Sequence, residues 1–192
     1  MSHSEDIKVT KSTNVTKRTN VILGLTNPKS PTNVGSVMRA SGCYGVDSVV
    51  YTGERYERAA QFNTDTHRNS HEIPLTRVED FLEVIPEDAT VVCVELVEGA
   101  IPLPAYEHPD NAFYIFGPED GNIQQKIINR VDDVVYVPTV GCMNLAATVN
   151  VLLYDRLAKS TNFITDNDLV KDSRDNNNKL RVKAVNRIGR TR

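Results

Sequence analysis

Short hydrophobic runs recur along the chain, and between them apolar residues return at the three- and four-residue spacing of a helix. The apolar runs predict strands at 20–25, 47–53, 90–96, 112–117 and 134–138, with a shorter one at 71–75. Helices are predicted over 33–45, 77–86, 122–131 and 144–159. Strands that alternate with helices at this spacing predict an α/β fold with a mainly parallel sheet flanked by helices.

Turn and capping residues set the expected boundaries of these elements. Thr32 or Asn33 can cap the start of the helix at 33–45, and Gly45 can end it. The polar stretch 54–71 is typical of a long surface loop with some helix before it. We expect one domain at 20–160, between a flexible polar extension at 1–19 and a basic, flexible tail at 161–192.

The amino-acid composition indicates the class of protein and the cell compartment in which we expect it. Hydrophobic residues make up 40% and charged residues 24% of the 192 residues, as in ordinary soluble globular proteins. No apolar run is long enough to cross a membrane, and the polar N-terminal stretch lacks the apolar core of a signal peptide. The sequence therefore predicts a cytoplasmic protein without membrane contact.

Charge is distributed unevenly. Residues 171–192 hold eight basic and two acidic residues, a net charge of +6, so the other 170 residues carry −9 within the total of −3. A basic tail on an acidic body indicates contact with an anionic partner, RNA or DNA first. A disordered tail that only increases solubility is an alternative that the sequence supports equally well.

The cysteines give no support for a disulfide framework or a metal centre. Cys43, Cys93 and Cys142 are odd in number and far apart, which favours reduced thiols. No CxxC, HExxH or clustered His/Cys spacing is present, so we expect no metal.

Open parallel sheets bind ligands at the carboxyl ends of their strands. Four turns qualify here, those after Leu25, Leu96, Phe116 and Val137. None is a GxGxxG or GxxxxGK[ST] loop, so a Rossmann dinucleotide site or a P-loop lacks its phosphate-binding element.

Taken singly, the polar residues near these turns have plain structural interpretations. Arg39 on a helix is usually a solvated surface group, and Asn144 at a helix start is usually an N-cap. Cys142 is usually a small buried hydrophobe, and the segment GPEDG at 117–121 is usually just a turn.

Three segments together carry more information than each alone. They are NVGSVMRASGCYGVDSVV at 33–50, FYIFGPEDGNI at 113–123 and VYVPTVGCMNLAATVNVLLYD at 135–155. In type, order and spacing they resemble the three motifs of the SpoU/TrmH branch of the SPOUT RNA methyltransferases. The resemblance covers roughly 20–160.

This resemblance implies a SPOUT (α/β-knot) fold with a deep C-terminal trefoil knot, a homodimer, and an active site completed across the dimer interface. It implies S-adenosyl-L-methionine as cofactor, bound in the knot by the strand-end loops. The positions that match the family's cofactor contacts are Leu96, Gly117, Val137, Cys142 and Met143.

The implied activity is methyl transfer to a ribose 2′-hydroxyl of tRNA or rRNA, with Arg39, Asn33, Glu119 and Asn144 at the catalytic positions. Arg39 matches the arginine that the family places on the hydroxyl and its neighbouring phosphate. Since a guanidinium is hard to deprotonate, positioning and charge stabilisation are favoured over a general-base role. The asparagines would hold the loops by hydrogen bonds, and Glu119 would organise the cofactor loop.

One position departs from the family pattern, which usually has Ser where this chain has Cys142. A thiol is a weaker hydrogen-bonding group than a hydroxyl. A SPOUT-fold protein that binds RNA or cofactor without catalysis, or with different specificity, is therefore the alternative. A different α/β nucleotide enzyme is a third hypothesis. The sequence does not name the RNA or the modified nucleotide.

Overall fold

The computed structural model describes residues 20–61, 73–160 and 167–182. The chain divides into two compact units, 1–159 and 160–192, of which the first contains a seven-stranded sheet. Its strands, in chain order, are β1 (Val21–Leu25), β2 (Ser48–Tyr51), β3 (Leu75–Arg77), β4 (Thr90–Val94), β5 (Ile101–Pro102), β6 (Ala112–Phe116) and β7 (Asp133–Tyr136).

All neighbouring strands of this sheet pair in parallel, in the order β3-β2-β1-β6-β4-β7-β5. The central strand β6 is buried along its whole length, and Phe116 at its end lies opposite Leu25 of β1 and Val94 of β4. The predicted α/β fold with a parallel sheet is confirmed, and strands buried on both faces explain the continuous apolar runs in the sequence.

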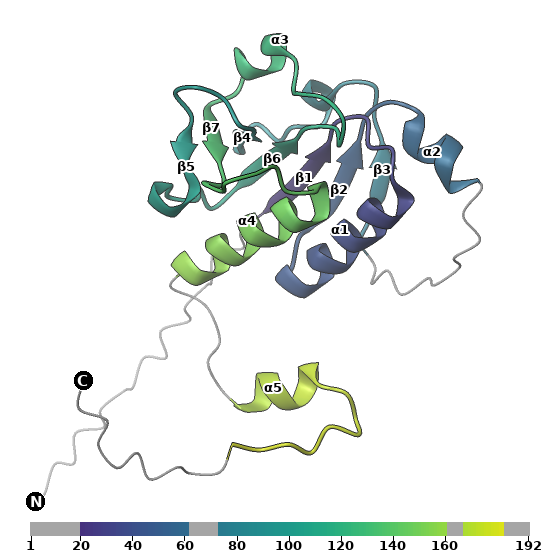
Figure 1. Cartoon of the computed structure of the whole chain (residues 1–192), viewed down its shortest axis with the longest axis vertical. Coiled ribbons are helices and arrows are strands. Elements are labelled where there is room, and N and C mark those ends of the chain that lie inside the picture. Colours follow the sequence, from purple (N-terminus) through teal and green to yellow (C-terminus); the bar gives the residue numbers. More distant parts are fainter. Residues whose placement is uncertain (1–19, 62–72, 161–166, 183–192) are drawn as a thin grey trace, which may run out of the picture. The chain divides into compact units, whose positions relative to one another are not determined.

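Helices and single turns cover the sheet. They are α1 (Pro31–Tyr44), α2 (Arg55–Ala60), α3 (Gln125–Ile128), α4 (Leu145–Lys159) and the 3₁₀ turns η1 (Phe81–Glu83) and η2 (Leu103–Ala105). The two long helices, α1 and α4, lie side by side on one face of the sheet (Figure 1). Val37 of α1 and Val149 of α4 are fully buried there. The opposite face packs Phe113 and Ile115 of β6 against Phe81 of η1.

A buried polar network fixes the C-terminal half of α4 to the segment before β6. The His108 ring nitrogens lie 2.7 Å from the Tyr114 hydroxyl and 3.0 Å from the Asp155 carboxylate. Arg156 donates to the Tyr114 hydroxyl, at 3.1 Å, and Lys159 to the Tyr106 carbonyl, at 3.0 Å. Burial lowers the pKa of His108 below its usual value of 6.5, so the ring is held neutral.

Two of the predicted helices differ from the structure. The helix predicted at 77–86 is wrong, since β3 occupies Arg77 and only one 3₁₀ turn follows. The Asp80 carboxylate caps this turn by accepting from the Leu82 amide at 3.0 Å. Phe81 is buried and Val78 and Ile85 are partly buried, but Leu82 is 51% exposed, so the apolar residues do not form one buried helical face. The helix predicted at 122–131 shrinks to the four residues of α3.

The boundaries of α1 are set by capping groups. The Ser30 hydroxyl accepts from the Asn33 amide at 3.2 Å, and Pro31 occupies the first turn, so the predicted capping by Thr32 or Asn33 is wrong. Gly45 ends the helix as predicted, with φ 69 in the left-handed region.

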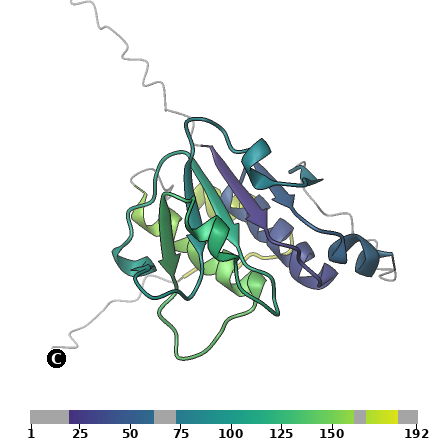
Figure 2. The same cartoon turned by 90° about the horizontal axis from the view of Figure 1, so that it is seen from above.

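The described part of the second unit contains α5 (Asn167–Ser173), which the sequence did not predict and which buries no residue. The predicted domain boundaries and the trefoil knot stay predictions. Among the residues that the structure describes, no helix has both the length and the apolarity to span a membrane. Figure 2 shows the fold from a second direction.

Candidate functional site

Loops at the carboxyl edge of the sheet enclose a cavity of about 420 Å³. Every predicted site residue except Arg39 lines it: Asn33, Leu96, Gly117, Glu119, Val137, Cys142, Met143 and Asn144. Residues more than a hundred positions apart in the chain thus meet at one edge of the sheet, beside the ends of β4, β6 and β7. This is the position at which open α/β sheets bind ligands.

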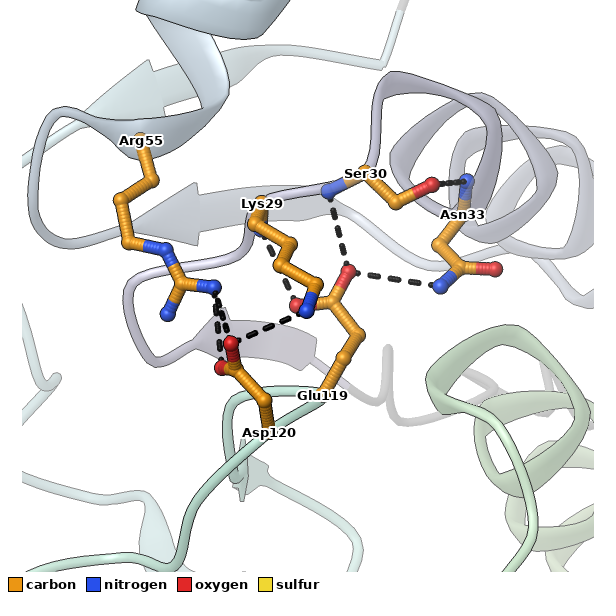
Figure 3. Close-up of polar contacts among 6 residues, drawn as sticks. All are labelled: Lys29, Ser30, Asn33, Arg55, Glu119 and Asp120. Carbon is orange, nitrogen blue, oxygen red and sulfur yellow. Dashed lines mark hydrogen bonds and ion pairs between the residues drawn. The ribbon is translucent and has the colours of Figure 1, made fainter.

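The Glu119 side chain joins two of these loops (Figure 3). Its carboxylate accepts hydrogen bonds from the backbone amides of Lys29, at 3.0 Å, and Ser30, at 3.1 Å, and from the side-chain amide of Asn33, at 3.3 Å. Partial burial alone would raise the pKa of Glu119, but these hydrogen bonds outweigh it and hold the pKa below its usual value. An ionised Glu119 therefore ties the loop after β6 to the start of α1.

Asp120 adds an ion-paired cluster beside Glu119. Its carboxylate lies 2.9 Å from the Lys29 ammonium and 2.9 Å from the Arg55 guanidinium. Hydrogen bonds from Lys29 and Arg55 lower the pKa of Asp120. Because Asp120 is exposed, the cluster orients the loop more than it stabilises the fold.

Glu95 also lines the cavity and was not among the predicted site residues. Its carboxylate accepts from the Ile123 amide at 3.1 Å and from the Leu96 amide at 3.0 Å. A Cβ on Gly117 would lie 2.8 Å from this carboxylate, so the glycine lets Glu95 approach the loop after β6. An acidic residue directly after a buried strand was the signal in the sequence that could have identified it.

The loop before α4 forms another wall of the cavity. The Asn144 side-chain oxygen accepts from the Ala147 amide at 2.8 Å, so Asn144 is the predicted N-cap as well as a lining residue. Cys142 is exposed, and its interpretation as a buried hydrophobe is wrong, whereas Met143 is half-buried.

Arg39 lies apart from the cavity of its own chain. It is exposed on α1, about 9 Å along the helix from Asn33 at 1.5 Å per residue. It forms no hydrogen bond or ion pair with any residue in 20–61, 73–160 or 167–182. The structure thus brings Asn33 and Glu119 into contact but does not bring Arg39 to them.

The lining combines apolar side chains, backbone groups and the carboxylates of Glu95 and Glu119. Such a cavity can hold a partly apolar ring beside a cationic group. No group of three or more His, Cys, Asp or Glu suited to a metal occurs among the described residues.

Comparison with known proteins identifies the family. The family model "SpoU rRNA Methylase family" matches residues 20–154. No curated protein sequence matches the chain.

Several solved structures share the fold. An rRNA methyltransferase from Sinorhizobium meliloti is 17% identical, with a TM-score of 0.58 over 72% of this chain and 56% of that one. The SpoU methyltransferase AviRb from Streptomyces viridochromogenes, in complex with AdoMet, is 17% identical, with a TM-score of 0.58 over 73% and 57%. A structure described as giving insights into "the 2-OH methylation of C/U34 on tRNA" is 22% identical, with a TM-score of 0.56 over 72% and 89%.

The chain spans little more than half the length of the first two of these proteins. The family match contradicts the hypothesis of a different α/β nucleotide enzyme, since it covers the whole sheet, α1 and the first ten residues of α4. The chain belongs to the SpoU rRNA methylase family.

Proposed function

We propose that this protein transfers a methyl group from S-adenosyl-L-methionine to a ribose 2′-hydroxyl of tRNA or rRNA. The observation that carries the proposal is the cavity of about 420 Å³ at the carboxyl edge of the sheet, which residues of all three motifs line together. Relatives of the same fold that are described as AdoMet-bound or as acting in tRNA 2-OH methylation support it.

The lining residues fit the cofactor in size and chemistry. A volume of about 420 Å³ is within the range of small-molecule sites. Leu96, Val137 and Met143 offer apolar contacts to an adenine ring, and the carboxylates of Glu95 and Glu119 favour a cation nearby. S-adenosylmethionine carries no phosphate, which agrees with the lack of a phosphate-binding loop. When bound, it would supply a methyl group already activated on a cationic sulfur.

The residues of the chain must then align the ribose oxygen and stabilise the charge that develops on it. Glu119 contributes by fixing the start of α1 against the cavity, since it receives three hydrogen bonds from the loop before the helix and its first turn. Arg39, on the same helix, is always charged and suits the phosphate and the developing alkoxide.

We further propose that Arg39 acts in the cavity of a second copy of the chain. Its exposed position on α1, away from its own cavity, supports this arrangement. The neighbouring helix α4 exposes Val151, Tyr154 and Leu157, at 38%, 62% and 42%, on one outward face. Exposed apolar side chains grouped on one helix are typical of a protein interface. A homodimer through α4 would cover them.

The basic residues of 171–192 support RNA contact by the C-terminal tail, and the three free cysteines agree with action in the cytosol. The alternative of a non-catalytic binding protein rests on one observation, that Cys142 lines the cavity where the family usually has Ser.

The test is a methyl-transfer assay with labelled S-adenosylmethionine and total RNA, run beside calorimetry of cofactor binding. We expect wild-type protein to label RNA, and Arg39→Ala to lose at least about a hundredfold in rate, as removal of a transition-state charge contact does. Arg58→Ala is the matched control. Arg58 is an exposed arginine on α2; it does not line the cavity and is not part of the proposed interface on α4. Cofactor binding without turnover on any RNA would favour the non-catalytic alternative, and neither binding nor turnover would overturn both.

A further inference from the structure

A second cavity, of about 370 Å³, opens at the same edge of the sheet on its other face. We propose that it binds one nucleotide of the RNA substrate, next to the nucleotide that is methylated. Its base would lie on the apolar floor and its phosphate on Lys126 and Arg130 at the rim. This inference rests on the proposed function and adds a substrate-recognition site to it.

The same two loops border both cavities, although no residue lines both. Thr26 and Asn27 line the second cavity, and two residues later Lys29 and Ser30 hold Glu119, which lines the first. On the other loop, Gln124 lines the second cavity and directly follows Ile123, whose amide binds Glu95 of the first. The second cavity is therefore bordered by the loops that also hold the lining of the first.

The floor of the second cavity suits a flat ring. It is formed by Phe81, Val91, Ile115 and Ile127, and the Phe81 ring is held edge-on to Phe113 with their centroids 5.8 Å apart. Aromatic and aliphatic surfaces bind unpaired bases by stacking, at about 1–3 kcal/mol per base in known complexes. The amides of Asn27 and Gln124 and the Thr52 hydroxyl also line the cavity, and such groups hydrogen-bond to base edges.

The backbone at the mouth of this cavity has an unusual conformation. Asn27 has φ 40 and Gly53 has φ 76, both in the left-handed region. A Cβ on Gly53 would lie 2.2 Å from the Asn27 side-chain oxygen, so a larger residue there would displace the Asn27 side chain. Positive φ at a residue other than glycine is costly and concentrates at functional sites. The Thr26 hydroxyl, buried without a hydrogen-bond partner in the described residues, adds to this cost.

The rim carries two cations, Lys126 and Arg130, and two carboxylates, Glu79 and Asp80. Lys126 and Arg130 are exposed and pair with no residue that the structure describes. Of the two acidic lining residues, Glu79 pairs with Arg77 at 3.0 Å, whereas Asp80 accepts from the Leu82 amide at 3.0 Å and keeps its negative charge. Two available cations beside a stacking floor match a base and its phosphate.

The kinetic test compares Arg130→Ala and Lys126→Ala with the control Arg58→Ala, using an RNA that the wild type methylates. Loss of one charged contact to a phosphate should raise the KM for RNA about tenfold and leave kcat and cofactor affinity unchanged. The control should keep the wild-type KM. Wild-type KM values in both variants and in Leu82→Trp, which places a large ring at the cavity mouth, would overturn the inference.

A binding test decides the matter without any activity. The four ribonucleoside 5′-monophosphates are titrated into the full chain, with inorganic phosphate alone as the comparison, and backbone amide signals are followed by NMR. We expect the nucleotides to shift the amides of Leu82 and Ile127, and Arg130→Ala to weaken this response. Equal shifts from phosphate alone, or shifts only around the first cavity, would contradict nucleotide binding here. An inactive wild type that still shows the expected shifts would count against the proposed methyl transfer and not against this site.

Discussion

Replacing Glu119 with Gln tests how the two loops of the candidate cofactor site are joined. The carboxylate accepts hydrogen bonds from the Lys29 and Ser30 amides and from the Asn33 side chain, at 3.0, 3.1 and 3.3 Å. A glutamine keeps one acceptor oxygen, but its NH₂ group must face an N–H donor, and the negative charge is lost. The change therefore removes at least one hydrogen bond and weakens the other two.

The expected cost follows from these contacts. Hydrogen bonds to a charged group contribute about 1.5–3 kcal/mol and neutral ones about 0.5–1.5 kcal/mol. Since Glu119 is only partly buried, we expect Glu119→Gln to lower the free energy of unfolding by about 2 kcal/mol. For a domain of this size that loss corresponds to a fall in Tm of about 4–8 °C. Cofactor affinity should fall too, because Asn33 and Gly117 line the same cavity.

The assay is thermal and urea unfolding across pH, with Asp120→Asn as the control. Asp120 is the neighbouring carboxylate but is exposed, so its loss should leave Tm unchanged. The pKa of Glu119 is lowered in the folded state, so its contribution is present above the unfolded value of about 4.3 and is lost as pH falls through the folded pKa. Equal stability of Glu119→Gln and wild type at pH 7, or a difference that does not shrink as pH falls below about 4.3, would refute the reasoning.

Three further changes test other parts of the account. Asn144→Ala removes the N-cap of α4 and should lower the free energy of unfolding by about 1 kcal/mol in urea titrations; no loss would contradict the capping role. His108 is held neutral by burial beside Asp155, so stability should fall as pH drops below about 6.5, and His108→Gln should remove this dependence. Gly117→Ala displaces the Glu95 carboxylate and should weaken cofactor binding in calorimetry by about tenfold, whereas unchanged affinity would show that the close approach is dispensable.

The sheet could be predicted because its strands leave continuous apolar runs, most clearly β6, which is buried along its whole length. The runs that became β1, β4, β6 and β7 are continuous and apolar, and each was placed within two residues. The two-residue β5 contains Pro102 and carries no periodicity, so it escaped prediction. The segment 77–86 misled because an apolar spacing alone cannot tell a helix from a strand followed by a single turn.

Some features of the candidate site could be predicted from the sequence and others could not. Residues on strand-end loops could be predicted because the parallel topology brings them to one edge, and motif order identified which loops matter. The contact between Glu119 and the loop before α1 depends on three-dimensional geometry that no local pattern encodes. Arg39 shows a second limit: its helix was predicted, but its separation from the cavity could not be predicted from the sequence.

The central claim is methyl transfer to a ribose oxygen, and the most direct measurement is the identity of the labelled product. RNA from cells that lack the gene is incubated with purified protein and methyl-labelled S-adenosylmethionine, and its nucleosides are analysed by mass spectrometry after alkaline hydrolysis. A methyl group on the 2′-oxygen blocks alkaline cleavage at that nucleotide, so the account predicts label in an alkali-resistant dinucleotide. Label in a methylated base, or no label in any RNA, would contradict it.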